Sequence, residues 1–233
     1  METGFYGGNM KKIALLIYPE FSMQEVADLL YLFRWGFDTK TVVISTSKEA
    51  ILSEEGISVL PEKTVDEFHK EEYHCLILPG CSDVSEALKD IALFQFLHSL
   101  KDETEFVIGA ICAGPMFLSM AHLLDDKKFA VSISVEVCEL FTGIKHDHIV
   151  YEPVVIDGSI VTAQGDAFRQ FAIAIARKVG FDCSDKAMSG VPSDWKTEDF
   201  IHHLTLEEQE EFQKEELPVF EEAYAKIQKA LNK

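Results

Sequence analysis

Residues 105–115 read EFVIGAICAGP, and this stretch decides the fold. Its first seven residues are mostly apolar, which predicts a strand buried on both faces. Pro115 suits the first turn of a helix, because its fixed φ is helical and its missing N–H needs no partner there. The stretch therefore predicts a central strand over 105–111, a sharp turn at Cys112 and a helix from Pro115 to about residue 122.

Outward from this stretch, short apolar runs alternate with helical patterns. Strands are predicted at 11–18, 41–45, 57–60, 75–78 and 129–133, with a hairpin over 151–163 that has a type I′ turn at Asp157-Gly158. Helices are predicted at 22–36, 65–73, within 83–100 and at 167–179. Strands that alternate with helices predict an α/β fold: a three-layer α/β/α sandwich whose mainly parallel sheet has helices on both faces.

The composition excludes several classes of function. The chain has 233 residues and a formal net charge of −19, which disfavours nucleic acid and anionic membranes as partners, since both need basic side chains. No apolar run approaches the roughly 20 residues of a membrane helix, and residues 1–9 lack the apolar core of a signal peptide. The five cysteines form no CxxC pair and indicate reduced thiols. We therefore expect a cytoplasmic protein.

Three segments are predicted. Residues 1–10 form an N-terminal extension, residues 11–185 the α/β domain, and residues 186–233 a C-terminal helical extension. This extension is acidic, and its apolar residues recur at helical spacing at Phe220, Tyr224, Ile227 and Leu231. The stripe is expected to dock on the domain or on a partner, while the acidic residues form a solvated face.

Cys112 is the first candidate for chemistry. It follows a strand and precedes a helix, so the unpaired N–H groups and positive potential of the helix terminus favour its thiolate. The small neighbours Ala113 and Gly114 leave room for a substrate, and the Ala113 N–H is the natural oxyanion donor. The alternative is a buried structural cysteine, which is the interpretation we favour for Cys75 and Cys138.

These motifs resemble the ThiJ/PfpI superfamily, which has a class I glutamine-amidotransferase-like, flavodoxin-type fold. The resemblance covers about residues 12–180 and is carried by FSMQEVA at 21–27, LPG at 78–80, AICAGP at 110–115 and DGSIVTAQG at 157–165. It implies that Cys112 is the reactive residue, that Glu25 hydrogen-bonds to it, and that Gly80 contributes an oxyanion-hole amide. It also implies a homodimer.

Glu25 is also a candidate on physical grounds. A carboxyl group that touches a thiolate in a desolvated pocket has a raised pKa, so it can stay protonated and donate to the sulfur. A structural role is the alternative, because Ser22 and Glu25 have the spacing of a helix capping box. Glu20 is a rival candidate for the acid.

The sequence departs from the superfamily pattern at two positions. Ile133 stands where many members have a histidine, which weakens amidotransferase and protease assignments, because a cysteine hydrolase needs a base. Cys81 stands where the superfamily usually has glycine, so it could serve as a resolving thiol for an oxidised Cys112. His146 and His148 flank an aspartate, but a solvated loop fits them better than a metal site, and we expect neither a metal nor a cofactor.

Two functions stay open at this point. The first is a hydrolase or lyase in which Cys112 attacks a small electrophilic substrate, similar to isonitrile hydratases or glyoxalase-like members of the superfamily. The second is a non-catalytic redox or ligand sensor that needs only a reactive Cys112.

Overall fold

The structure is a computed structural model that describes residues 11–134, 138, 143–187 and 205–218. The chain divides into two units, Met1–Ser189 and Gly190–Lys233. In the second unit the described residues form α6 (Leu206–Glu211) and a π-helical turn (Phe212–Glu216). The predicted apolar stripe of the C-terminal extension lies outside the described residues. None of the helices in the described part of the chain is long and apolar enough to cross a membrane.

A seven-stranded sheet forms the centre of the first unit, in the order β5-β2-β1-β6-β7-β9-β8. All neighbouring strands run parallel except β8 and β9, which form an antiparallel hairpin at one edge. The strands are β1 (Lys12–Leu16), β2 (Thr41–Ser45), β5 (Lys63–Thr64), β6 (Tyr73–Leu78), β7 (Val107–Ile111), β8 (Val154–Asp157) and β9 (Ile160–Ala163). A separate hairpin pairs β3 (Ile51–Leu52) with β4 (Ser58–Val59).

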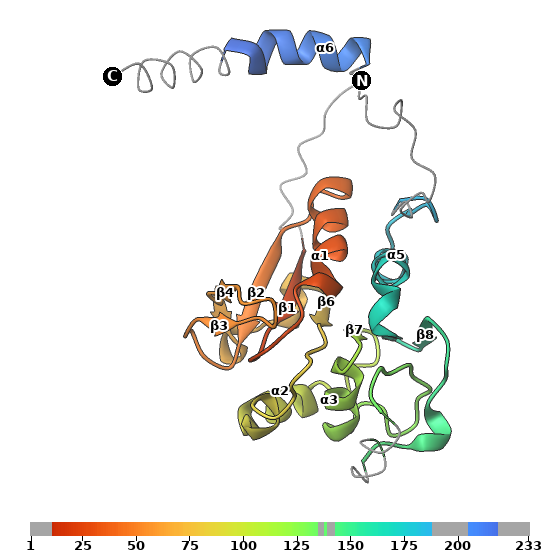
Figure 1. Ribbon diagram of the computed structural model, residues 1–233. Coiled ribbons are helices and arrows are strands. Elements are labelled where there is room, and N and C mark those ends of the chain that lie inside the picture. Colours follow the sequence, from red (N-terminus) through yellow and green to blue (C-terminus); the bar gives the residue numbers. More distant parts are fainter. Residues whose placement is uncertain (1–10, 135–137, 139–142, 188–204, 219–233) are drawn as a thin grey trace. The chain divides into compact units, whose positions relative to one another are not determined.

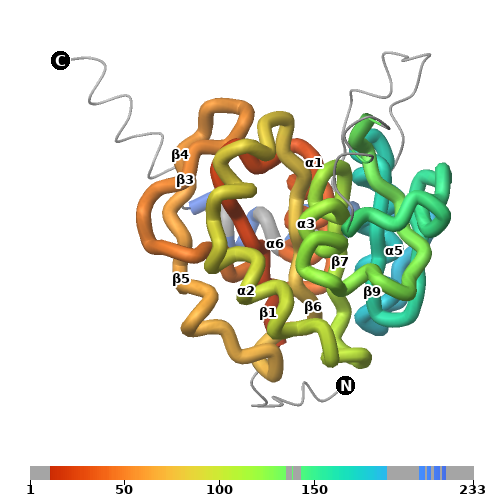
Figure 2. The backbone as a smooth tube through the Cα atoms, turned by 90° about the horizontal axis from the view of Figure 1, so that it is seen from below, coloured from red at the N-terminus to blue at the C-terminus, as the bar shows by residue number. Residues whose placement is uncertain are grey.

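Helices cover both faces of this sheet. α1 (Gln24–Tyr31) packs beside α5 (Phe168–Lys178) on one face, while α2 (Ile91–Ser99) and α3 (Gly114–Met120) lie on the other (Figure 1). Seen from below, α2 and α3 lie in front of the central strands (Figure 2). The central strands are almost entirely buried because both faces are covered, and every residue of β7 is buried. The predicted three-layer sandwich is confirmed.

Three local predictions were wrong. Residues 129–133 form only a single β-bridge, from Phe129 to Ile149, and no strand. The reason is that the Ala130 N–H donates to the Thr162 hydroxyl and not to the backbone of a neighbouring strand. Residues 65–73 form two short 3₁₀ turns, Val65–Glu67 and Lys70–Glu72, of which the first is closed by a capping box between Thr64 and Glu67. The β8–β9 turn falls at Gly158-Ser159, where only the glycine has positive φ, as in a type II′ turn.

Candidate functional site

The carboxyl ends of four neighbouring strands meet at one edge of the sheet. α1 follows β1, Gly80 follows β6, Cys112 follows β7 and Gly165 follows β9. This edge is where open α/β sheets place their ligand sites. The order of the strands thus brings together Glu25 of α1, Gly80, Cys112 and Gly165, which are far apart in the sequence.

Cys112 has a left-handed backbone conformation, with φ of +58°. This conformation costs a non-glycine residue about 1–2 kcal/mol, so the surroundings must impose it. The Cys112 N–H donates to the Ala163 carbonyl at 2.9 Å, and the Cys112 carbonyl accepts from the Ser132 N–H at 2.9 Å. Because the N–H and the carbonyl of Cys112 are both hydrogen-bonded to neighbouring segments, its half-buried side chain is held out of the packed sheet.

Glu25 lies in the first turn of α1 and faces the sulfur. Its Oε2 accepts the Gly80 N–H at 2.6 Å, and its carboxyl group also hydrogen-bonds to Cys112. The alternative role of Glu25, a capping box with Ser22, is not formed, since Met23 precedes the helix without a side-chain cap. Instead, Glu55 accepts from the N–H groups of Met23 and Gln24 at 3.2 and 2.9 Å. The N–H groups at the start of α1 are thus satisfied by Glu55, so the carboxyl group of Glu25 is not needed as a cap and hydrogen-bonds to Cys112 instead.

Two glycines enclose the Glu25–Cys112 pair. A β-carbon at Gly80 would lie 2.5 Å from both the Cys112 Cβ and Glu25 Oε2. A β-carbon at Gly165 would lie 3.2 Å from both the Cys112 sulfur and Glu25 Oε1. The first distance is far below van der Waals contact, so the loop after β6 passes the pair only because residue 80 has no side chain.

Ala113 and Gly114 complete the turn. Burial raises the pKa of the Cys112 thiol, and the hydrogen bond from the Ala113 N–H to the Cys112 side chain offsets part of this rise. Gly114 permits a close approach, since a β-carbon there would lie 2.8 Å from the Pro79 carbonyl oxygen. The buried Tyr18 hydroxyl also donates to this Pro79 carbonyl, which fixes the loop from below.

Burial raises the pKa of both titratable groups of the site. Burial raises the pKa of Glu25, against the hydrogen bonds from Cys112 and Gly80 that lower it. Burial also raises the pKa of Cys112 well above its usual range, and the Glu25 carboxylate adds to this. Because the two side chains hydrogen-bond to each other, ionising both would place two like charges side by side, which disfavours the doubly ionised form.

Cys112 lines two cavities. A cavity of about 450 Å³ is lined by Glu25, Glu54, Cys81, Ser82, Val84, Cys112, Ala113, Met116, Ser132, Ile133 and Ser134. A smaller one of about 240 Å³ is lined by Ser22, Gln24, Glu25, Glu54, Cys112, Ser132, Gly165, Asp166 and Phe168. Their size suits a small molecule, and Glu25, Glu54, Cys112 and Ser132 line both.

The structure places Ile133 in the wall of the larger cavity. Among the described residues, no histidine lines either cavity. Glu20 lines neither of them, whereas Glu25 lines both. His146 and His148 lie in a 3₁₀ turn away from these cavities, and the described residues include no group of three or more His, Cys, Asp or Glu placed to hold a metal ion.

Sequence reasoning missed Ser132, Glu54 and Gly165. The Ser132 hydroxyl donates to Gln164 Oε1 at 2.6 Å and accepts the Gly165 N–H at 2.9 Å, so it joins two loops beside the sulfur. Glu54 reaches the cavities from the β3–β4 turn. Gly165 ends the quoted DGSIVTAQG motif, which was a usable signal, but nothing in the sequence pointed to Ser132 or Glu54.

Comparisons of this chain with known proteins agree on one family. The model of the DJ-1/PfpI family matches residues 11–178. An uncharacterized protein from Methanocaldococcus jannaschii is 27% identical over 178 residues, which is 73% of this chain and 84% of that protein. The deglycase PfpI of Pyrococcus furiosus is 24% identical over 170 residues, covering 72% of this chain and 93% of the deglycase.

A solved structure, that of a DJ-1 superfamily protein from Agrobacterium tumefaciens, matches with a TM-score of 0.67 at 23% identity. The match covers 74% of this chain and 92% of that chain. At this identity the likeness shows the fold alone.

Proposed function

Since this chain belongs to the DJ-1/PfpI family, we propose that it is an enzyme that acts on a small electrophilic substrate through the thiol of Cys112. One observation carries the proposal: the strained Cys112 lies against the carboxyl group of Glu25 at the mouth of two small cavities. Relatives of this chain include a protein named as a deglycase.

The hydrogen bonds indicate where the proton of the pair is held. Oε2 of Glu25 accepts the Gly80 N–H, so the proton of a neutral Glu25 belongs on Oε1. There the proton stays on Glu25 and forms a hydrogen bond to the sulfur, so Cys112 can be held as the thiolate without a second negative charge beside it. The Ala113 N–H adds a further donor to that sulfur.

The reaction then needs one proton carrier. The Cys112 sulfur attacks a carbonyl carbon, a C–S bond forms while the C=O π bond breaks, and the Glu25 proton moves to the carbonyl oxygen. The product is a thiohemiacetal, and Glu25 is left as a carboxylate that can accept the next proton. The predicted oxyanion roles of Gly80 and Ala113 both require an exchange of partners. The Gly80 N–H has to leave Glu25, and the Ala113 N–H has to leave the Cys112 sulfur, before either can donate to the substrate oxygen.

The lack of a histidine in the described cavity walls narrows the reaction type. Hydrolysis of an amide requires protonation of a leaving group and activation of water, for which two groups are usually used. Addition to an α-oxoaldehyde followed by an internal proton shift forms a thioester on Cys112 with no leaving group to protonate, and water then cleaves the C–S bond to give a 2-hydroxy acid and the free thiol. One carboxyl group, that of Glu25, can carry the proton in each of these steps. We therefore rank a lyase or glyoxalase-like reaction before an isonitrile-hydratase-like or amidohydrolase reaction.

The test is turnover of methylglyoxal, an isonitrile and a simple amide by the full chain. Turnover that is abolished in Cys112→Ala and retained in Cys183→Ala supports the proposal. Cys183 is a matched control, because it is a buried cysteine that lines neither cavity. Unchanged turnover in Cys112→Ala, or no turnover of any of the three, overturns it.

The alternative is a redox sensor, which one observation favours: Cys81 lines the same cavity as Cys112. Peroxide would oxidise the Cys112 thiolate to a sulfenic acid, and the Cys81 thiol would displace water from it to form a disulfide. Burial raises the pKa of Cys81 to about 12, which slows this second step. A Cys81–Cys112 disulfide after mild peroxide, without turnover, would favour the sensor.

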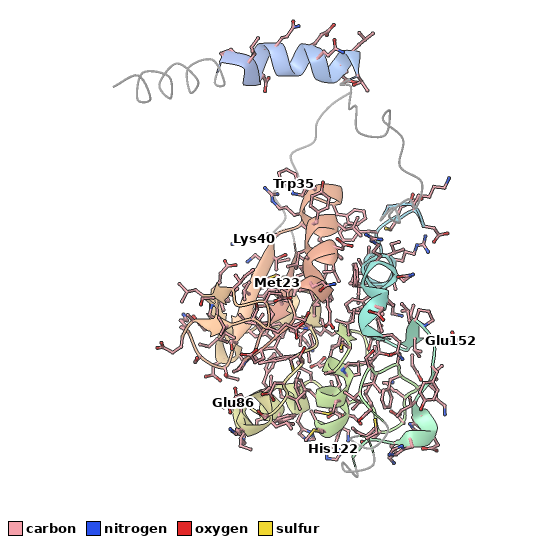
Figure 3. All side chains as sticks on the ribbon, in the orientation of Figure 1. Met23, Trp35, Lys40, Glu86, His122 and Glu152 are labelled. Carbon is pink, nitrogen blue, oxygen red and sulfur yellow. The ribbon has the colours of Figure 1, made fainter. Side chains whose placement is uncertain are left out.

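A cytoplasmic homodimer is also proposed, on the composition and the family resemblance. Tyr31 at the end of α1 and Trp35 in the π-helical turn that follows it support a partner surface, since they are 64% and 70% exposed. Trp35 is labelled in Figure 3. Sedimentation of the wild type and of the double variant Tyr31→Ser, Trp35→Ser would test the dimer. A monomeric wild type would contradict it.

A further inference from the structure

We propose that Glu54 is a specificity-determining residue, which keeps anionic electrophiles away from Cys112 and admits neutral or cationic ones. This inference rests on the proposed function, because it takes Cys112 as the reacting group. It adds the charge class of the substrate, which neither the motifs nor the relatives specify.

Glu54 is fixed at the entrance to the reacting sulfur. It lies in the β3–β4 turn, it is half-buried, and it lines both cavities that open at Cys112. Its Oε2 accepts the Ser82 N–H at 2.8 Å and the Ser82 hydroxyl at 2.7 Å. Its own N–H donates to the Phe21 carbonyl at 3.1 Å. Backbone and side chain are thus both anchored, so the carboxylate cannot swing away from an incoming substrate.

The charge of Glu54 is not compensated locally. Within the described part of the chain, Glu54 forms no ion pair, and no Lys, Arg or His lines either cavity. The other ionisable groups of the cavity walls are Glu25, Asp166 and the two cysteines. Among the described wall residues, an anionic substrate would therefore meet acidic groups only, and its carboxylate or phosphate would find no cationic partner there.

The field of Glu54 reaches the reacting pair. Burial is the main cause of the raised pKa of Glu25 and of Cys112, and repulsion from Glu54 contributes to both. A group whose charge acts on the sulfur acts likewise on a charged atom bound next to the sulfur. Two like charges a few ångströms apart near a protein surface lower association by about threefold to tenfold.

Alkylation of Cys112 by a neutral and an anionic reagent of similar size separates the repulsion between Glu54 and the reagent from the effect of Glu54 on the reactivity of the thiol. Rates with iodoacetamide and iodoacetate are measured at one pH and one low ionic strength, and the modified cysteine is identified by peptide mapping. Their ratio cancels the fraction of thiolate, which Glu54 also affects. Glu54→Gln keeps the acceptor for Ser82, and Glu49→Gln is the matched control, because it removes one exposed acidic charge outside the cavities.

We expect the iodoacetamide-to-iodoacetate ratio to fall about threefold to tenfold in Glu54→Gln, further in Glu54→Lys, and not in Glu49→Gln. Added salt should shrink the difference between wild type and Glu54→Gln. If Glu54→Gln fails to fold, Ser82→Ala loosens the same carboxylate and should lower the ratio in part.

Failure of the proposed function and failure of the proposed role of Glu54 give different results. If Cys112 of the folded wild type resists iodoacetamide, the proposed function falls. If Cys112 reacts but the ratio is the same in wild type, Glu54→Gln and Glu54→Lys, the role of Glu54 in specificity is overturned while the nucleophile stands.

Discussion

Gly80 donates its backbone N–H to Glu25 Oε2 at 2.6 Å, although the two residues are 55 positions apart. This bond joins the loop after β6 to the start of α1. It also assigns an acceptor role to one of the two carboxyl oxygens of Glu25. The other oxygen is thereby available to carry the proton that the proposed reaction uses.

Replacing Glu25 tests that proton. In the proposed mechanism Glu25 is neutral and donates to the sulfur, unlike its carboxylate, which raises the pKa of Cys112. Glu25→Leu removes this donor, so the pKa of Cys112 should rise and alkylation by iodoacetamide near neutral pH should slow about tenfold. Glu25→Gln retains an amide donor and should slow the reaction less. The measurement is the alkylation rate against pH. Faster alkylation in Glu25→Leu would mean that an ionised Glu25 repels the thiolate.

The pH dependence of stability has a defined sign. Burial raises the pKa of Glu25 in the folded chain above its unfolded value of about 4.3. The stabilisation from the bound proton is therefore complete below the unfolded pKa and is lost as the pH rises through the folded pKa. Urea denaturation from acidic to neutral pH should show the wild type losing stability relative to Glu25→Gln. A relative gain by the wild type over this window would contradict the assignment.

Side chains at the enclosing glycines should disturb the pair in proportion to the space available. Gly80→Ala places a β-carbon 2.5 Å from Cys112 and Glu25, so we expect a loss of about 1–3 kcal/mol in the free energy of unfolding and of most Cys112 reactivity. Gly165→Ala, at 3.2 Å, should have a smaller effect. Gly143→Ala is the control, since its β-carbon would find its nearest atoms at 3.9 Å. Equal behaviour of all three variants in denaturation and alkylation would refute this explanation.

The backbone strain at Cys112 can be measured directly. At φ of +58° glycine avoids a cost of about 1–2 kcal/mol, which exceeds the 0.5–1 kcal/mol that its extra flexibility costs elsewhere. Cys112→Gly should therefore unfold at a higher urea concentration than Cys112→Ala. The opposite order would show that the left-handed conformation is not strained in this protein.

Much of the fold followed from the sequence, because burial leaves a clear pattern. The largely apolar runs of β1, β6 and β7 require a sheet covered on both faces, and the family match confirms the resemblance carried by residues 110–115. Residues 129–133 show the limit of this reasoning. They look like a strand, but their N–H groups are used by Thr162 and Cys112, which no local pattern reveals.

The candidate site was predictable only where a residue carries its own signal. Cys112 stands at a recognisable strand-to-helix turn, and Glu25 lies in a motif shared with the superfamily. Ser132 and Glu54 enter the site through tertiary hydrogen bonds to Gly165 and Ser82, so their contribution depends on how distant loops pack. The capping partner of α1 escaped prediction for the same reason, because Glu55 lies about thirty residues from the helix that it caps.

Adjacent residues of the β3–β4 turn carry two separate tasks. Glu54 faces the cavities, while Glu55 holds the first N–H groups of α1. Since consecutive side chains point in different directions, inserting or deleting one residue in this turn would misplace both carboxylates at once. The length of the turn is thus constrained more tightly than its composition, and homologues that share this mode of helix capping should vary here by substitution rather than by insertion or deletion.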